Sequence, residues 1–321
     1  KEYNSYFSDP TLMQNALYNS LFGISGAGRD ISDSKYIYNV SPTYRLASSK
    51  IDLELGVKYT GFQKDNGLKH RVYPVVNASL KLIDEFVPFA GIDGGVAMND
   101  YRSVTLKNPF IAPGMNMAMN ATDCSYAISA GAKGNIENVF VYNVYGKYSL
   151  LKDFYFFVNS DQTLLNSNAN AAPVALGNNF DAVYDDIQQL KVAAELKLSA
   201  GIVDASLSAA YYSYTLDKLQ AAFHLPTYTL DLNVDVAVTK SLTLNLNGHA
   251  RSETAYFYSA ASGETSYNDA FLDLGIGAEY LFNRSFSVFL NANNLLDNRY
   301  LIWHGYKVPG LGVLGGITFK F

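Results

Sequence analysis

The chain has 321 residues and a formal net charge of −5, with only 17% charged but 49% apolar residues, whereas globular domains usually carry about 25% charged residues. No apolar run reaches the length of about 18 residues that a membrane-spanning helix requires. The acidic balance, with Lys and Arg scattered, argues against a nucleic-acid-binding protein. A single cysteine, Cys124, excludes an internal disulfide and a multi-cysteine metal site.

The first 36 residues differ in pattern from the rest of the chain. Asp9-Pro10 ahead of a short run of apolar residues predicts a capped short helix within a loop. We therefore divide the chain into residues 1–36, an outward loop with a short helix, and residues 37–321, a series of strands. No plug domain is predicted in either part.

From residue 37 onward, apolar and polar residues alternate with a period of two, as in strands with one apolar and one polar face. The runs are sustained over about 9 to 12 residues, longer than the usual 5–6 of globular strands. The clearest alternating runs are 51–60, 189–198, 229–238, 242–249 and 272–280. Abundant aromatic residues, 25 Tyr and 19 Phe, suit the two rims of a membrane barrel.

The connections between these strands alternate in length. Short turns are predicted at 48–49, 83–84, 137–138, 200–201, 240–241 and 283–284, and long connections near 61–70, 99–122, 160–184, 214–226, 252–268 and 294–310. The alternation holds only if 139–159 forms one long strand. Short turns on one side and long loops on the other are typical of outer-membrane barrels. The predicted fold is an all-β, antiparallel transmembrane β-barrel of long meandering strands, with about 13 or 14 strands in this chain.

The last strand ends at the final residue, with Phe319 and Phe321 on one face. A terminal Phe on such a strand resembles the signal by which bacterial outer-membrane barrels are recognised for insertion. By that resemblance, the lipid bilayer with its lipopolysaccharide and the barrel-assembly machinery are expected partners. The alternative is an ordinary last strand of a globular sheet.

Residues 284–321 carry a more specific resemblance. The segment from Asn291 to Tyr300 (NANNLLDNRY) is similar to the exit of the penultimate strand in TonB-dependent receptors, although the basic residue, Arg299, lies one place later than usual. The segment from Trp303 to Gly310 resembles the closing loop of Bacteroidota members. The resemblance implies a Gram-negative outer membrane, and uptake of a scarce nutrient such as a glycan, a peptide or a metal chelate. It also implies a TonB-type energiser or a surface lipoprotein as partner.

The sequence departs from that family because it contains neither a plug nor a TonB box. An odd strand count with a downward first strand differs from complete bacterial barrels, which have an even count. We therefore expect the carboxy-terminal portion of a larger barrel, about the last thirteen strands if the whole has 22, as plugged transporters do. Two alternatives remain open. One is a plugless barrel that serves as a structural subunit of an outer-membrane complex, and the other is a passive porin.

Candidate site residues fall into two groups. The polar rows supply candidates that face the lumen and would form a solute path or a wall against which a plug docks. The alternative is that they only form a hydrated surface of mutually hydrogen-bonded side chains. These candidates are Asp231, Asn233, Asp235, Asn245, Asn247, His249, Arg251, Asp273 and Glu279. The outward loops supply ligand candidates, whose aromatic members also fit an interfacial girdle: Asn178, Asp181, Tyr256, Tyr258, Trp303 and Tyr306. The Asn-rich stretch 166–186 offers oxygen ligands for calcium or sugar, but it lacks the spacing of a calcium loop.

An enzyme is not expected. His249 and Ser252 are three residues apart and so point to opposite faces of a regular strand. The other histidines, His70, His224 and His304, are isolated in predicted loops. No zinc spacing, phosphate loop or serine elbow is present. We therefore predict no catalytic residue, no metal site and no cofactor.

Overall fold

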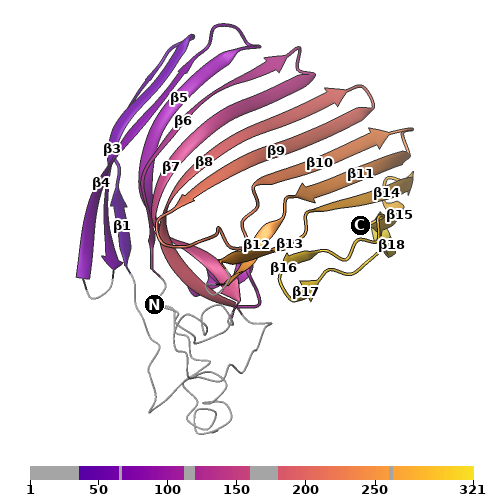
Figure 1. The fold of residues 1–321 in the computed structure, drawn as a ribbon. Helices are drawn as coiled ribbons and strands as arrows, with labels where there is room; N and C mark the ends of the chain where they lie inside the picture. Colours follow the sequence, from indigo (N-terminus) through magenta and orange to yellow (C-terminus); the bar gives the residue numbers. More distant parts are fainter. Residues whose placement is uncertain (1–35, 65–66, 112–119, 160–179, 260–262) are drawn as a thin grey trace.

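The computed structural model describes residues 36–64, 67–111, 120–159, 180–259 and 263–321. Most of them form one 14-stranded antiparallel sheet that curves like the wall of a barrel (Figure 1). β1 and β2 lie one after the other beside β3, so the fourteen strands occupy thirteen places. The predicted all-β architecture and strand number are confirmed.

From β3 onward, each strand of the sheet pairs with the next sheet strand along the chain, whereas β1 and β2 both pair with β3. In sheet order the strands are β1 (Ile37–Val40) and β2 (Thr43–Ala47), β3 (Ile51–Lys64), β4 (Gly67–Leu80), β5 (Val87–Ala97), β6 (Thr122–Ile136), β7 (Phe140–Asn159), β8 (Phe180–Ala200), β9 (Val203–Leu216), β10 (Tyr228–Ala237), β11 (Leu242–Arg251), β14 (Phe271–Asn283), β15 (Phe286–Asn293) and β18 (Gly312–Phe319). A helix and two hairpins lie in the long connections: α3 (Tyr101–Lys107), β12 (Thr254–Ser259) with β13 (Glu264–Asn268), and β16 (Leu301–Trp303) with β17 (Tyr306–Lys307).

All six predicted short turns separate consecutive strands, and they gather at one end of the sheet, the turn end (Figure 1). At the turn between β6 and β7, Glu137 and Asn138 have φ of 53° and 57°, the left-handed conformation that tight hairpins use. β7 forms one strand of 20 residues, as the alternation of turn lengths required, with a shift of its register against β8 between Leu151 and Phe154. The described parts of the long connections lie at the opposite end, the loop end.

The structure corrects two predicted loops. The segment 61–70 is not a loop, because β3 and β4 stay paired up to Lys64 and Gly67. The segment 160–184 is shorter than expected, because β8 already begins at Phe180. Both errors arise where the strands continue beyond the clear two-residue alternation. The helix predicted within residues 1–36 lies outside the described residues.

The register places the apolar rows of neighbouring strands on one face. Leu232 faces Leu207 on one side and Gly248 on the other, and Ile276 pairs with Leu246 and Ala292. Many large side chains of this face are exposed: Leu55, Val57, Val72, Val192, Tyr211, Leu244, Leu246, Leu272, Ile276, Leu290, Val313 and Ile317. An apolar band of this extent is what a sheet presents to hydrocarbon.

Dense packing is found instead at the loop end. There β7 and β8 extend beyond their neighbours, and residues 155–158 of β7 are buried on both faces. One face packs against α3 and the β16–β17 hairpin, and the other packs against residues 219–225 and β12. We call this assembly of loops around the β7–β8 tip the loop layer.

The two edges of the sheet have no partner within the described part of the chain. β18 pairs with β15 alone, and β1 and β2 pair with β3 alone. Across the same residues, no helix combines the length and the apolar character needed to cross a bilayer.

Candidate functional site

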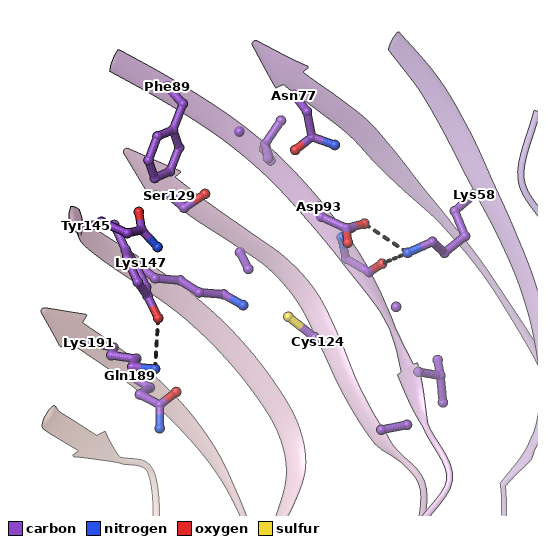
Figure 2. A pocket seen from close by; sticks show the side chains of 18 of the residues that line it. Lys58, Asn77, Phe89, Asp93, Cys124, Ser129, Tyr145, Lys147, Gln189 and Lys191 are labelled. Carbon is purple, nitrogen blue, oxygen red and sulfur yellow. Dashed lines mark hydrogen bonds and ion pairs between the residues drawn. The ribbon is translucent and has the colours of Figure 1, made fainter. Parts of the chain in front are cut away.

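The concave face of the sheet holds a cavity of about 1010 Å³, formed by β1 and by the strands from β3 to β9. Figure 2 shows its side chains converging from neighbouring strands. Its polar and aromatic lining includes Asn39, Lys58, Asn77, Phe89, Asp93, Ser129, Asn143, Tyr145, Lys147, Gln189, Lys191, Glu195 and Tyr212. Because side chains alternate between faces along a strand, the polar rows line this cavity while the apolar rows face away from it.

Several charges on the polar face are neutralised in pairs. The Lys58 ammonium contacts Asp93 at 2.9 Å and donates to the Gly94 carbonyl at 2.8 Å. The Arg71 guanidinium donates to Asp123 at 3.1 Å, and this buried carboxylate also accepts from the Tyr73 hydroxyl at 2.7 Å. Buried charges are costly unless they are paired in this way.

The predicted lumen-facing residues of β10, β11 and β14 share the polar face. Three of them form a row across the sheet, with Asp231 opposite His249 and His249 opposite Asp273. The register continues from Asp231 through Ser208 to Glu195, which lines the cavity. The other pairs in register are Asn233 with Asn247, Asp235 with Asn245, Arg251 with Thr229 and Phe271, and Glu279 with Thr243.

Most of these side chains hydrogen-bond to a neighbour. His249 Nδ1 lies 2.5 Å from Asp231 Oδ1, and Glu279 accepts from Ser287 at 2.6 Å. Asp273 accepts from the Tyr300 hydroxyl at 2.6 Å, so the loop between β15 and β18 is fastened to the wall. Arg251 instead turns towards the loops, where it donates to the Ile302 carbonyl at 3.2 Å. A hydrated, mutually bonded wall therefore accounts for their local contacts.

The candidate ligand-binding residues of the loops do not form the open outer surface that the sequence predicted. Asn178 and the side chain of Tyr258 lie outside the described residues, and Asp181 is buried. The three remaining aromatic candidates pack inside the loop layer. Tyr256 stacks on His304 with 3.5 Å between the ring centroids, and Tyr306 stacks on Phe110 with 3.4 Å. Trp303 contacts Phe157 and Phe180 edge-on, with centroid distances of 5.1 and 5.6 Å. Ring faces used in this packing are not presented as an open stacking surface.

His224 is central to the loop layer, although the sequence showed it only as an isolated loop histidine. It is buried, its Nδ1 donates to the Phe157 carbonyl at 2.9 Å, and its Nε2 accepts from the His304 backbone at 3.5 Å. Burial lowers the pKa of His224 to about 4, and the nearby Arg251 and His304 act in the same direction. The ring is therefore neutral at pH 7 and joins the tip of β7 to two loops.

Asp185 does not offer an oxygen ligand for calcium. Its carboxylate accepts from the backbone N–H groups of Asp186, Asp217, Lys218 and Leu219 at 2.9 to 3.1 Å. Such a nest of amides suits an anion and anchors the 217–219 loop to β8. Within the described ranges, no group of three or more His, Cys, Asp or Glu side chains could hold a metal ion.

Two lysines of the cavity, Lys147 and Lys191, were not among the sequence candidates. The alternation of residues 189–198 placed Lys191 on the polar face. The pairing of β7 with β8, which the sequence does not reveal, sets Lys147 directly opposite it. Cys124 also lines this cavity and forms no disulfide.

Comparison with solved structures identifies the fold. The pyoverdine outer-membrane receptor FpvA from Pseudomonas aeruginosa superimposes with a TM-score of 0.64 at 13% identity, over 89% of this chain and 42% of that one. The siderophore receptor PiuA from Acinetobacter baumannii gives 0.63 at 12%, over 89% and 43%. The copper transporter OprC gives 0.59 at 14%, over 89% and 47%. The chain shares the β-barrel fold of these solved outer-membrane proteins.

The chain spans less than half the length of each of these proteins. No protein-family model matches it, and no curated protein does. The solved structures with this fold are described as two receptors and a transporter.

Proposed function

We propose that this chain forms part of the wall of a TonB-dependent receptor-like barrel in the outer membrane of a Gram-negative bacterium, and that the barrel takes up a scarce nutrient through its lumen. One observation carries the proposal. A curved sheet thirteen strands wide has an exposed apolar face on one side and a polar cavity on the other. That combination fits a wall between hydrocarbon and a water-filled interior.

The free edges of the sheet support a larger barrel. Unpaired backbone N–H and C=O groups are not tolerated in hydrocarbon, so a membrane sheet must close on itself. We propose that further strands outside the described sheet complete the wall between β18 and the β1–β2 edge. The described strands would then be the carboxy-terminal portion of a barrel of the Bacteroidota type, as the resemblance of residues 284–321 implies.

The proposed mechanism begins at the loop layer, which captures the nutrient. The nutrient then passes along the polar face after a TonB-type energiser has moved a plug, and a surface lipoprotein is a further candidate partner. Phe319 at the end of β18 and Phe321 beyond it would serve as the insertion signal for the barrel-assembly machinery. Phe319 is 63% exposed and available for such recognition.

Uptake is testable in the native bacterium. We expect a strain lacking the full-length protein to lose growth when one metal chelate, glycan or peptide is the limiting nutrient. A protonophore should abolish accumulation of that labelled nutrient in wild-type cells, because energised transport depends on the proton gradient.

Two other results would contradict energised uptake. Steady conductance of the purified full-length protein in a planar bilayer, with uptake insensitive to protonophore, would identify a passive porin. Normal growth on every nutrient, together with stoichiometric co-purification of other outer-membrane proteins, would identify a structural subunit.

A further inference from the structure

Two lysines lie directly opposite each other in the wall of the cavity. Lys147 of β7 and Lys191 of β8 are partners in the β-ladder, and both side chains line the concave space (Figure 2). Like charges placed opposite one another on adjacent strands destabilise a sheet. A negative charge between or beside the two ammonium groups would offset that repulsion.

The neighbouring positions on the same face supply no such charge. Within the described residues, the six positions that surround the pair in the register contain hydroxyl, amide or methyl side chains and no carboxylate: Ser129, Tyr145, Ser149, Gln189, Ala193 and Tyr212. The local environment is therefore cationic, with hydrogen-bonding groups on several sides.

The two carboxylates elsewhere in the cavity make their direct contacts with other groups. Asp93 contacts the ammonium of Lys58 at 2.9 Å, and Glu195 accepts from the side-chain amide of Asn143 at 3.1 Å. Glu195, on the same strand and face as Lys191, keeps its charge and offsets part of the charge of Lys191. Within the described wall, however, neither lysine of the pair forms an ion pair with a carboxylate, and Lys147 faces no acidic partner in the register.

Lys191 is held in a defined position. Its ammonium donates to the Tyr145 hydroxyl at 3.0 Å and lies 5.4 and 5.7 Å from the ring centroids of Tyr145 and Tyr212. Cation–π contacts of this kind fix a lysine without neutralising it. A fixed ammonium beside a second one is suited to bind two oxygens of one anionic group.

We propose that the Lys147–Lys191 pair binds the anionic group, a carboxylate or a phosphate, of a solute inside the barrel. The proposal rests on the proposed uptake function and narrows its substrate to an anionic nutrient. The anion would accept from both ammonium groups, and the hydroxyl and amide groups around them would complete its hydrogen bonds.

Lysine acetylation tests the site without requiring transport. The full-length protein in detergent at low ionic strength is treated with an acetylating ester, and each lysine is followed by peptide mass spectrometry. Citrate and inorganic phosphate are the probes, with choline chloride of equal ionic strength as reference. We expect one of the anions, at about ten times its dissociation constant, to slow acetylation of both lysines about tenfold, because only the unoccupied site reacts.

Lys197 provides the matched control. It lies on the same strand and the same face as Lys191, but its ladder partners are Val141 and Ser206. Acetylation of Lys197 should not respond to either anion. Lys147→Gln should remove the protection of Lys191, Lys147→Arg should retain it, and Lys197→Gln should leave it unchanged.

Two outcomes would overturn the proposal. Acetylation rates that are equal with and without both anions would exclude an anion site. Lysines that stay unreactive in the absence of any probe would show that an acidic group of the protein itself occupies the pair. Either result would overturn the anion site without contradicting nutrient uptake. Conversely, a negative result in the uptake experiment would not change the acetylation rates, so the two proposals are tested separately.

Discussion

Individual residues decide how closely the parts of this wall approach one another. At the turn end, the β4–β5 connection folds onto β6 beside Gly134, where Asn135 donates its N–H to the Asp84 carbonyl at 3.0 Å. The Tyr142 hydroxyl donates to the Glu85 carbonyl at 2.8 Å. A Cβ atom at Gly134 would lie 1.9 Å from the Glu85 carbonyl oxygen, so only glycine allows this approach.

Gly134→Ala should therefore destabilise the barrel. The clashing atom belongs to backbone, so the turn must move, and overpacking of this kind costs about 1–3 kcal/mol. Gly146→Ala is the control, because nothing lies within 4 Å of its added Cβ. Urea unfolding of the full-length protein in liposomes measures both. Equal midpoints for the two variants would show that the turn does not depend on Gly134.

The strands and loops show how far sequence patterns reach. Alternation and turn spacing predicted the strands of the wall, including β7 as one long strand, because a sheet with one apolar and one polar face imposes a period of two. They placed the start of β8 too late, because Phe180 lies inside the predicted connection 160–184, at a tip where both faces are buried and alternation gives no signal. They also missed the β3–β4 hairpin, whose Asn66-Gly67 pair is a tight-turn signal.

The candidate site was only partly predictable. The polar rows followed from the sequence, but the Lys147–Lys191 pair depends on which strands are neighbours and in which register. The role of His224 depends on contacts with Phe157 and His304, which lie 67 and 80 residues away along the chain. Such long-range contacts leave no local pattern in the sequence.

The loop layer should open on acidification. The pKa of His224 is about 4 in the folded chain and about 6.5 when unfolded, so the unfolded state binds more protons between these values. Stability contributed by neutral His224 is present above about pH 6.5 and is lost as the pH falls towards 4. Hydrogen exchange of residues 217–227 and 294–310, corrected for the intrinsic rate, should accelerate across this window.

His224→Gln should remove most of that pH dependence, because glutamine cannot take up a proton. His249→Gln is the matched control, since His249 is an exposed residue of the wall paired with Asp231. An unchanged pH profile in His224→Gln would assign the opening to another group, with His304 the first to examine.

At the scale of the whole molecule, the two faces of the sheet set what surrounds it. Ile276 is 48% exposed on the apolar face in the middle of β14. Asn233 lies on the polar face, in register with Ser206 and Asn247. If the apolar face contacts lipid, a charge should be tolerated at only one of these positions.

Ile276→Arg should cost about 2–4 kcal/mol of stability in liposomes, the penalty for arginine near the bilayer midplane. Asn233→Arg should cost much less, because the new side chain enters the water-filled interior. Urea unfolding of the full-length protein compares the two. Equal losses of stability in the two variants would contradict the assignment of one face of the sheet to lipid and the other to water.

Because β7 and β8 extend beyond their neighbours at the loop end, the loops around them are constrained in how they can change during evolution. Residues from α3, the 217–227 connection and both accessory hairpins pack on this single two-stranded tip instead of on their own strands. If one of these four loops were replaced by the corresponding loop of a relative, its side chains would no longer fit those of the other three loops. Exchange of all four loops together with residues 152–187 would keep their packing contacts intact. Recombination should therefore exchange these segments together more often than one at a time.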